Sequence, residues 1–175
     1  MWESILDFFR RRSISKDASA VPTGLLPLDA IHSAVAFIDV EDTSFNECKN
    51  AILSYFKARG IKCELFFIDF RKLSEGERLI TSITTTVLKK DLNWYGRPSR
   101  EKVDLMLEGE PDLFISLLPT MHFPLEYMAR CSRARFKVGR CQPASGPVFD
   151  LVLSDSALPQ DQAFVQICKL LETVR

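Results

Sequence analysis

Two loops carry the residue types that acid–base or metal chemistry would need. Asp39 and Asp42 follow an apolar run at residues 34–38. Thr120 and His122 follow a later apolar run. If both runs are parallel strands, these loops share the sheet edge at which open α/β proteins bind ligands. Carboxylates facing a histidine could transfer protons or bind a divalent cation, whereas the alternative is a solvated acidic loop and a histidine that bonds only its own turn. We favour that alternative, because site signals of this kind are weak.

A second candidate site is the segment at residues 93–98, which reads Asn-Trp-Tyr-Gly-Arg-Pro. Asn93, Trp94 and Arg97 could stack on a ring-shaped ligand and hydrogen-bond it. Equally, Trp94 could fill a gap beneath the loop while Arg97 pairs with a surface acid. Both interpretations stay open, because glycine and proline would hold the loop rigid in either case.

Several cofactor classes are disfavoured by the motifs that the chain lacks. It has no glycine-rich dinucleotide motif and no P-loop motif, and three carboxylates at Asp39, Glu41 and Asp42 would repel a pyrophosphate at the first loop. Two histidines and scattered cysteines offer no ligand spacing for a metal. We therefore expect neither a metal nor another cofactor.

The composition is that of one globular domain. The chain has 175 residues, of which 46% are hydrophobic and 26% charged, and 23 basic residues balance 23 acidic ones. Nothing in this balance attracts nucleic acid. The longest run without a charged residue, at residues 113–125, is too short to span a bilayer. Five cysteines without a Cys-x-x-Cys pair predict free thiols and a cytoplasmic location.

Basic side chains gather in the segment that follows residue 129. Alternation along the expected strand puts Arg135 and Lys137 on one face. With the net charge compensated, we expect a solvated basic face rather than an anion site. The members are Arg130, Arg133, Arg135, Lys137 and Arg140.

The hydrophobic pattern predicts an α/β fold in three layers, with a Rossmann-like, mostly parallel sheet of about six strands. Residues 25–175 are expected to form this single domain, in which the runs 34–38 and 113–118 are adjacent central strands. Ser44 and Glu47 have capping-box spacing for a helix. The expected strands are 34–38, 63–70, 83–88, 113–118, 136–138 and 149–153, and the expected helices follow residues 44, 99, 123 and 159, with a short turn at 74–77.

The N-terminus is expected to be an amphipathic helix at residues 1–12, joined to the domain by a linker at residues 13–24. Its apolar stripe should pack against protein, first against its own domain and second against a partner or another copy of the chain. Its mixed charges argue against a strong membrane anchor. The stripe consists of Trp2, Ile5, Leu6 and Phe9.

The segment at residues 100–140 resembles the N-terminal domain of heptosyltransferase-type glycosyltransferases. The resemblance rests on Glu-Pro-Asp-Leu-Phe-Ile-Ser-Leu at 110–117 and Ser-Arg-Ala-Arg-Phe-Lys-Val-Gly at 132–139. It implies that Asp42 matches the proposed base of those enzymes, although their preceding glycine is missing here. It also implies a second, sugar-nucleotide domain, for which the residues after Arg140 leave no room, so transfer activity is not expected.

The whole chain also resembles a family of small, uncharacterised bacterial α/β proteins, through the segments at residues 92–98 and 134–139. That resemblance implies no activity. The sequence therefore favours a non-catalytic protein that acts through protein–protein contacts. The alternative is an enzyme or binding protein that holds a sugar- or nucleotide-like molecule in the crevice at the strand ends.

Overall fold

The computed structural model describes residues 1–72 and 84–175 of the chain. The helical turn expected at residues 74–77 lies outside this part, as does the first residue of the strand expected at 83–88. Within the described residues, the predicted α/β architecture is confirmed.

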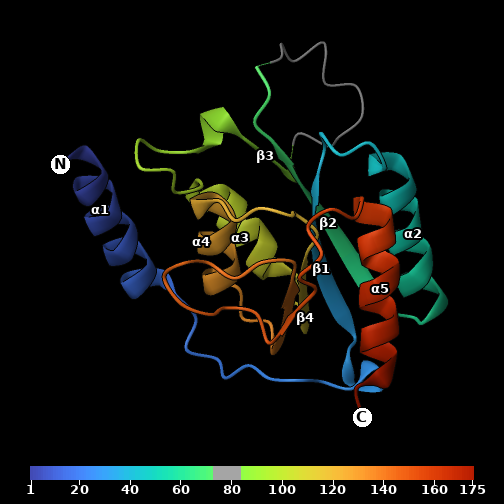
Figure 1. Ribbon diagram of the computed structural model, residues 1–175. Coiled ribbons are helices and arrows are strands. Elements are labelled where there is room, and N and C mark those ends of the chain that lie inside the picture. Colours follow the sequence, from blue (N-terminus) through green and yellow to red (C-terminus); the bar gives the residue numbers. More distant parts are fainter. Residues whose placement is uncertain (73–83) are drawn as a thin grey trace.

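Six strands form one sheet in which every neighbouring pair is parallel (Figure 1). The order is β3-β2-β1-β4-β5-β6, so the prediction that β1 and β4 are adjacent at the centre is confirmed. Their register pairs Ala34 with Leu113 and Phe37 with Ser116. The strands are β1 (Ser33–Asp39), β2 (Lys62–Asp69), β3 (Thr86–Leu88), β4 (Leu113–Ser116), β5 (Phe136–Gly139) and β6 (Leu151–Val152).

Helices cover both faces of the sheet, because successive side chains of a strand point to opposite faces. Ala36 and Ile38 of β1 join one core cluster with α2 and α5, while Phe37 joins the other with α3 and α4. The helices are α2 (Phe45–Ala58), α3 (Arg100–Glu108), α4 (Phe123–Cys131) and α5 (Gln160–Thr173), with single turns at Leu28–Ala30 and Lys89–Asp91. No helix in residues 1–72 or 84–175 is long and apolar enough to cross a bilayer.

The capping box expected at Ser44 does not form. Ser44 does precede α2, but its hydroxyl donates to Asp42 and accepts from the backbone N–H of Asp161, at the start of α5. The two helices begin side by side, so this side chain serves the neighbouring helix instead of its own.

The N-terminal helix α1 (Trp2–Asp17) is longer than predicted, because residues 13–17 continue it. Its last turn is held from outside by the hydroxyl of Tyr127, which donates to Asp17 at 2.6 Å. Residues 18–24 then run along the domain, with the N–H of Ser19 bonded to Arg130 and that of Gly24 to Arg135. Figure 1 shows α1 beside α4, at the end of the molecule opposite α5.

Candidate functional site

The acidic loop after β1 is bound to the start of α5. Asp42 accepts hydrogen bonds from the N–H groups of Ser44 at 2.8 Å and Gln160 at 3.3 Å. The side-chain amide of Gln160, which is fully buried, accepts from the N–H of Asp39 and donates to its C=O. The Asp39 carboxylate accepts from the N–H of Glu41. These contacts hold the loop in place and occupy Asp42 with backbone bonds.

Thr120 and His122 lie together on the loop before α4, where the Thr120 hydroxyl and the His122 ring nitrogen are 3.4 Å apart. The imidazole ring packs edge-on against Phe70, with 6.0 Å between ring centres. Among the described residues, no hydrogen bond or ion pair joins His122 to Asp39 or Asp42. The described residues also contain no group of three or more His, Cys, Asp or Glu side chains arranged to hold a metal ion.

The basic segment after α4 forms the expected solvated face only at Arg133 and Arg135, which are exposed. Arg140 is 2% exposed and donates to the carbonyls of Leu117, Asp155 and Leu158. Lys137 is also buried. For Lys137 and Arg140 the prediction is wrong, because backbone carbonyls at the ends of strands, helices and loops need donors, which these long cationic side chains supply.

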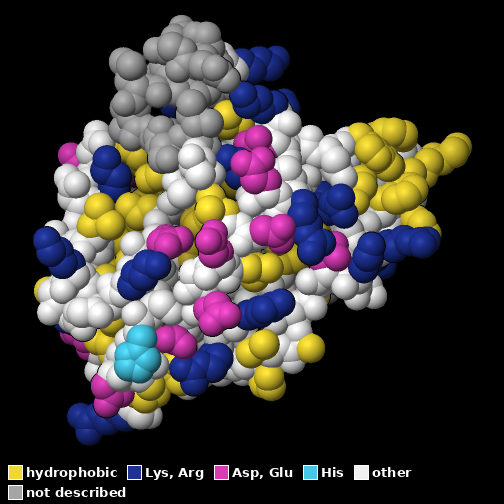
Figure 2. All heavy atoms as spheres, turned by 180° about the vertical axis from the view of Figure 1, so that it is seen from behind, with side chains coloured by type: hydrophobic (Ala, Val, Ile, Leu, Met, Phe, Trp, Pro, Cys, Tyr) yellow, Lys and Arg dark blue, Asp and Glu magenta, His cyan; other side chains and the backbone are white. Residues whose placement is uncertain are grey.

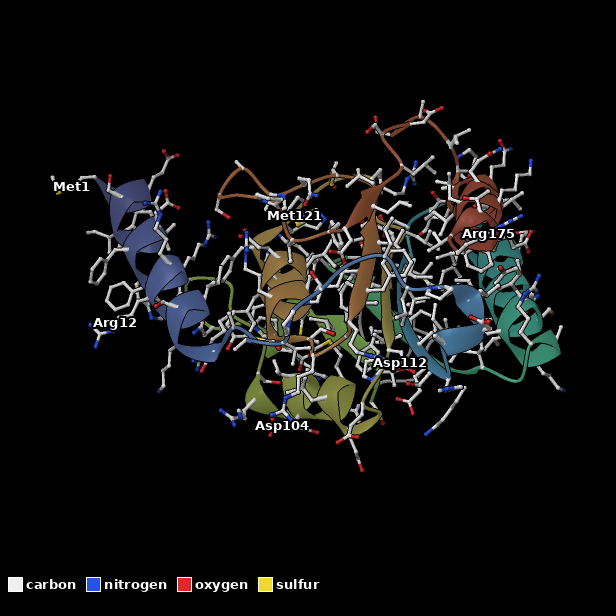
Figure 3. All side chains as sticks on the ribbon, turned by 90° about the horizontal axis from the view of Figure 1, so that it is seen from below. Met1, Arg12, Asp104, Asp112, Met121 and Arg175 are labelled. Carbon is white, nitrogen blue, oxygen red and sulfur yellow. The ribbon has the colours of Figure 1, made fainter. Side chains whose placement is uncertain are left out.

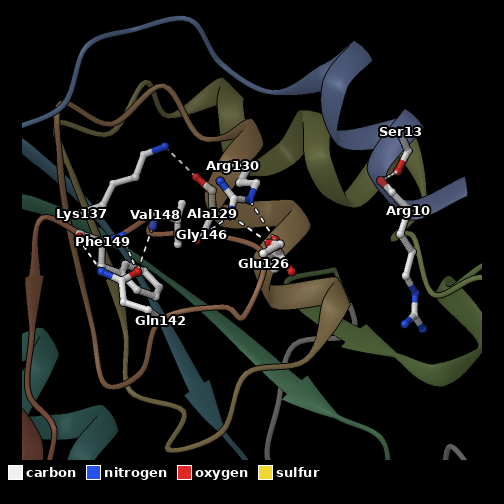
Figure 4. A network of polar contacts seen from close by, with 11 residues as sticks. Arg10, Ser13, Glu126, Ala129, Arg130, Lys137, Gln142, Gly146, Val148 and Phe149 are labelled. Carbon is white, nitrogen blue, oxygen red and sulfur yellow. Dashed lines mark hydrogen bonds and ion pairs between the residues drawn. The ribbon is translucent and has the colours of Figure 1, made fainter. Parts of the chain in front are cut away.

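A polar network around α4 fixes the loop that follows β5 (Figure 4). Arg130 donates to the Glu126 carboxylate at 2.9 Å and to the Gly146 carbonyl at 2.8 Å. The side-chain amide of Gln142 closes the same loop, since it donates to the Phe149 carbonyl. These polar side chains form hydrogen bonds to one another and to the backbone of the loop, and so stabilise the fold.

The segment at residues 93–98 folds back on itself. The Asn93 side-chain oxygen accepts from the N–H groups of Tyr95 at 3.2 Å and Arg97 at 2.9 Å. Gly96 has φ of 92°, a left-handed conformation that suits glycine. The side-chain oxygen of Asn93 is therefore used within the turn. The loop turns Trp94 outward, where this residue is 56% exposed.

Helix α1 packs against this loop. The Arg10 guanidinium donates to the carbonyl of Tyr95 at 2.8 Å and lies over the Phe123 ring at 5.0 Å. Arg97 lies 3.9 Å from the Asp17 carboxylate. The structure thus brings Asn93, Trp94 and Arg97 together with α1. Besides the packing of Phe9 on Tyr95, the polar side chains Arg10 and Asp17 hold the helix, and sequence reasoning missed these two.

The apolar side of the same helix faces outward. Trp2 is 64% exposed and Phe8 58%, and the rings of Trp2 and Phe9 lie 5.9 Å and 4.9 Å from that of Trp94. Figure 2 shows these hydrophobic side chains projecting from one end of the molecule. Of the predicted stripe, Leu6 is half-buried. We call the exposed set the aromatic tip: Met1, Trp2, Ile5, Phe8, Phe9 and Trp94.

The expectation for the stripe therefore holds in part. Leu6 is half-buried and Phe9 packs on Tyr95 of the domain, whereas Trp2 and Ile5 stay exposed to solvent. The sequence signal that could have found this arrangement is Phe8, which extends the apolar surface of the helix beyond the stripe.

The fold and this surface define a class: a doubly wound parallel α/β protein that carries an N-terminal helix with an exposed aromatic face. The chain belongs to DUF6913, a family of unknown function, which it matches over residues 5–174. No curated protein matches the chain, and no solved structure does. The resemblance to an uncharacterised family is confirmed at this level, while the bacterial origin and the likeness to glycosyltransferases stay predictions.

Proposed function

We propose that the protein is a non-catalytic docking protein, which attaches to another cellular component through the aromatic tip. The observation that carries this proposal is that the N-terminal half of α1 keeps Trp2, Ile5 and Phe8 exposed to solvent although the helix is attached to the domain. Surface helices normally turn such large apolar side chains toward the core. Large exposed apolar patches of this kind mark interaction sites, because each such side chain gains about 1.5–3 kcal/mol when it is buried.

The contacts at the strand ends support docking over catalysis. Asp42 is bonded to the backbone of Ser44 and Gln160, and His122 is bonded to Thr120. A proton-transfer or cation site would need these groups to converge on one ligand. The alternative function, a small-molecule site formed by Asp39, Asp42, Thr120 and His122, rests on residue types alone.

The same proposal places the protein in a reducing compartment such as the cytoplasm. All five cysteines are free, and Cys48, Cys131 and Cys168 are buried. Burial raises the pKa of the Cys48 thiol to about 12, which keeps it protonated and unreactive.

A site-specific photo-crosslinker tests the docking function. The reactive amino acid replaces Phe8 in the full chain, expressed in the cells that produce the protein. The matched control replaces Val165, an exposed apolar residue of α5 that is 48% exposed. We expect discrete adducts, to protein or to lipid, at position 8 and none at position 165. Equal labelling at the two positions would overturn the proposal.

A further inference from the structure

We infer that the component to which the aromatic tip docks is the surface of an anionic lipid membrane, an inference that rests on the docking function proposed above. The aromatic tip and the exposed cations that follow it on α1 are the features that favour such a surface.

The outward side of α1 changes from apolar to basic along the helix. Met1, Ile5 and Phe8 are followed on the same line by Arg12 and Lys16, since residues three and four positions apart share one side of a helix. All five side chains are exposed. Figure 3 shows Met1 and Arg12 on the side of α1 that is turned away from the domain.

The acidic side chains of α1 are turned to a different side. Asp7 lines a groove of about 510 Å³ between α1 and α4, together with His122 and Gln142. Glu3 lies one helical turn before Asp7 and so shares its side of the helix. The structure therefore separates the charges that looked mixed in the sequence, and the outward line carries cations only.

The spacing along this line suits the layers of a lipid leaflet. Arg12 follows Phe8 by four residues, which is about 6 Å along the helix axis. Interfacial helices bury their apolar faces about 5–10 Å into the headgroup and acyl boundary. With Ile5 and Phe8 at that depth, Arg12 and Lys16, which follow them along the helix, reach the phosphates.

Two features favour a membrane over a protein groove. The tip is convex and projects from the molecule, and a fluid bilayer can close around a convex surface without a preformed pocket (Figure 2). Arg12 and Lys16 form no ion pair with another described residue, so both are available to lipid phosphates. Each such cation adds about fivefold to the affinity for an anionic surface.

Intrinsic fluorescence reports on the tip alone, because the two tryptophans of the chain, Trp2 and Trp94, both belong to it. The full-length protein is mixed with phosphatidylcholine vesicles, with or without a third of phosphatidylglycerol. We expect a blue shift and co-sedimentation with the anionic vesicles, both weakening as salt is raised.

Two variants test the two parts of the tip. Phe8→Ser should weaken vesicle binding about tenfold or more, because one buried aromatic side chain is lost. The double variant Arg12→Glu, Lys16→Glu should abolish the preference for anionic vesicles. Val165→Ser, at an exposed position on α5, should bind as the wild type does. Circular dichroism checks that each variant is folded.

The outcomes separate this inference from the docking function. Absence of binding to anionic vesicles, or binding that the Phe8 and Arg12 variants leave unchanged, overturns the membrane inference. If the crosslinker at position 8 then gives protein adducts, the docking function stands and the partner is a protein. If position 8 gives no adducts either, both are overturned.

Discussion

Lys137 keeps its ammonium group inside the fold, where it is 4% exposed (Figure 4). It donates to the carbonyl of Ala129, near the end of α4, at 2.6 Å. The position suits a cation, because the last carbonyls of a helix are unpaired and partly negative. Desolvation nevertheless lowers the pKa of Lys137 to about 8, since burial disfavours the charged form.

The lowered pKa of Lys137 predicts a pH dependence of stability. The folded value of about 8 lies below the ordinary value of 10.5, so the unfolded state holds the proton more tightly. The cost of the buried charge is therefore greatest below pH 8 and disappears toward pH 10.5. The free energy of unfolding of Lys137→Met relative to wild type should therefore be highest at neutral pH and fall by up to about 3 kcal/mol toward pH 10.5, as urea denaturation at a series of pH values would show.

A matched control for Lys137→Met is Lys169→Met, at an exposed position on α5. Because its side chain is already in solvent, this substitution should change the free energy of unfolding little. A difference for Lys137→Met that is independent of pH would contradict the prediction.

Gly139, the last residue of β5, lies directly against the ring of Phe149. A Cβ atom at this position would come within 2.5 Å of two ring carbons. Gly139→Ala should therefore displace Phe149 and cost about 1–3 kcal/mol of unfolding free energy, measured by chemical denaturation. Gly24→Ala is the control, because no atom lies within 4 Å of its Cβ, and an equal loss there would refute the steric explanation.

At the level of whole elements, the attachment of α1 depends on its last turn. Tyr127→Phe removes the 2.6 Å hydrogen bond to Asp17 and should cost about 1.5–3 kcal/mol of unfolding free energy, since one bond to a charged acceptor is lost. We expect faster amide hydrogen exchange in the last turns of α1, with little change in α2. Tyr55→Phe, which removes a 3.3 Å bond to Glu172, should leave exchange in α1 unchanged. Unaltered exchange in Tyr127→Phe would show that this bond does not hold the helix.

The central strands could be predicted from the sequence because local pattern and tertiary position agree there. β1 and β4 are continuous apolar runs, which only burial on both faces explains. The end of α1 could not be predicted in the same way. Its last turn is held by Tyr127, more than a hundred residues away, and no local pattern reports such a contact.

The candidate site, too, could be predicted only in part. The residue types at Asp42 and His122 were visible, but their partners were not, because Gln160 comes from the other end of the chain. The apolar residues of the N-terminal helix were visible too. Their outward orientation was not, since it depends on where Arg10 finds the carbonyl of Tyr95.

For the molecule as a whole, buried thiols limit stability at alkaline pH. Burial raises the pKa of Cys48, Cys63 and Cys168 to about 12 and that of Cys131 to about 11, from an ordinary value of 9.0. Their contribution is complete below pH 9 and is lost as the pH rises toward 12, because the unfolded thiols ionise first. The ionisation of four thiols should outweigh the opposite effect of Lys137 on the free energy of unfolding.

The free energy of unfolding should therefore fall steeply above about pH 9, as denaturation at a series of pH values would reveal. Cys48→Ala should make the decline shallower, because it removes one of the ionising thiols. Stability that stays constant between about pH 9 and pH 11 would contradict the predicted burial of these groups.

The strand order also has a consequence for biosynthesis. β1 lies between β2 and β4, and Ser33, at its start, is 79 residues from its hydrogen-bond partner Asp112. While the chain is being translated, β1 can pair with β2 early, but its other edge has to wait until β4 has left the ribosome. During that interval an apolar strand edge is open to other nascent chains. Ribosomal products that stop before Leu113 should therefore need chaperones to stay out of aggregates, whereas full-length chains bury that edge themselves.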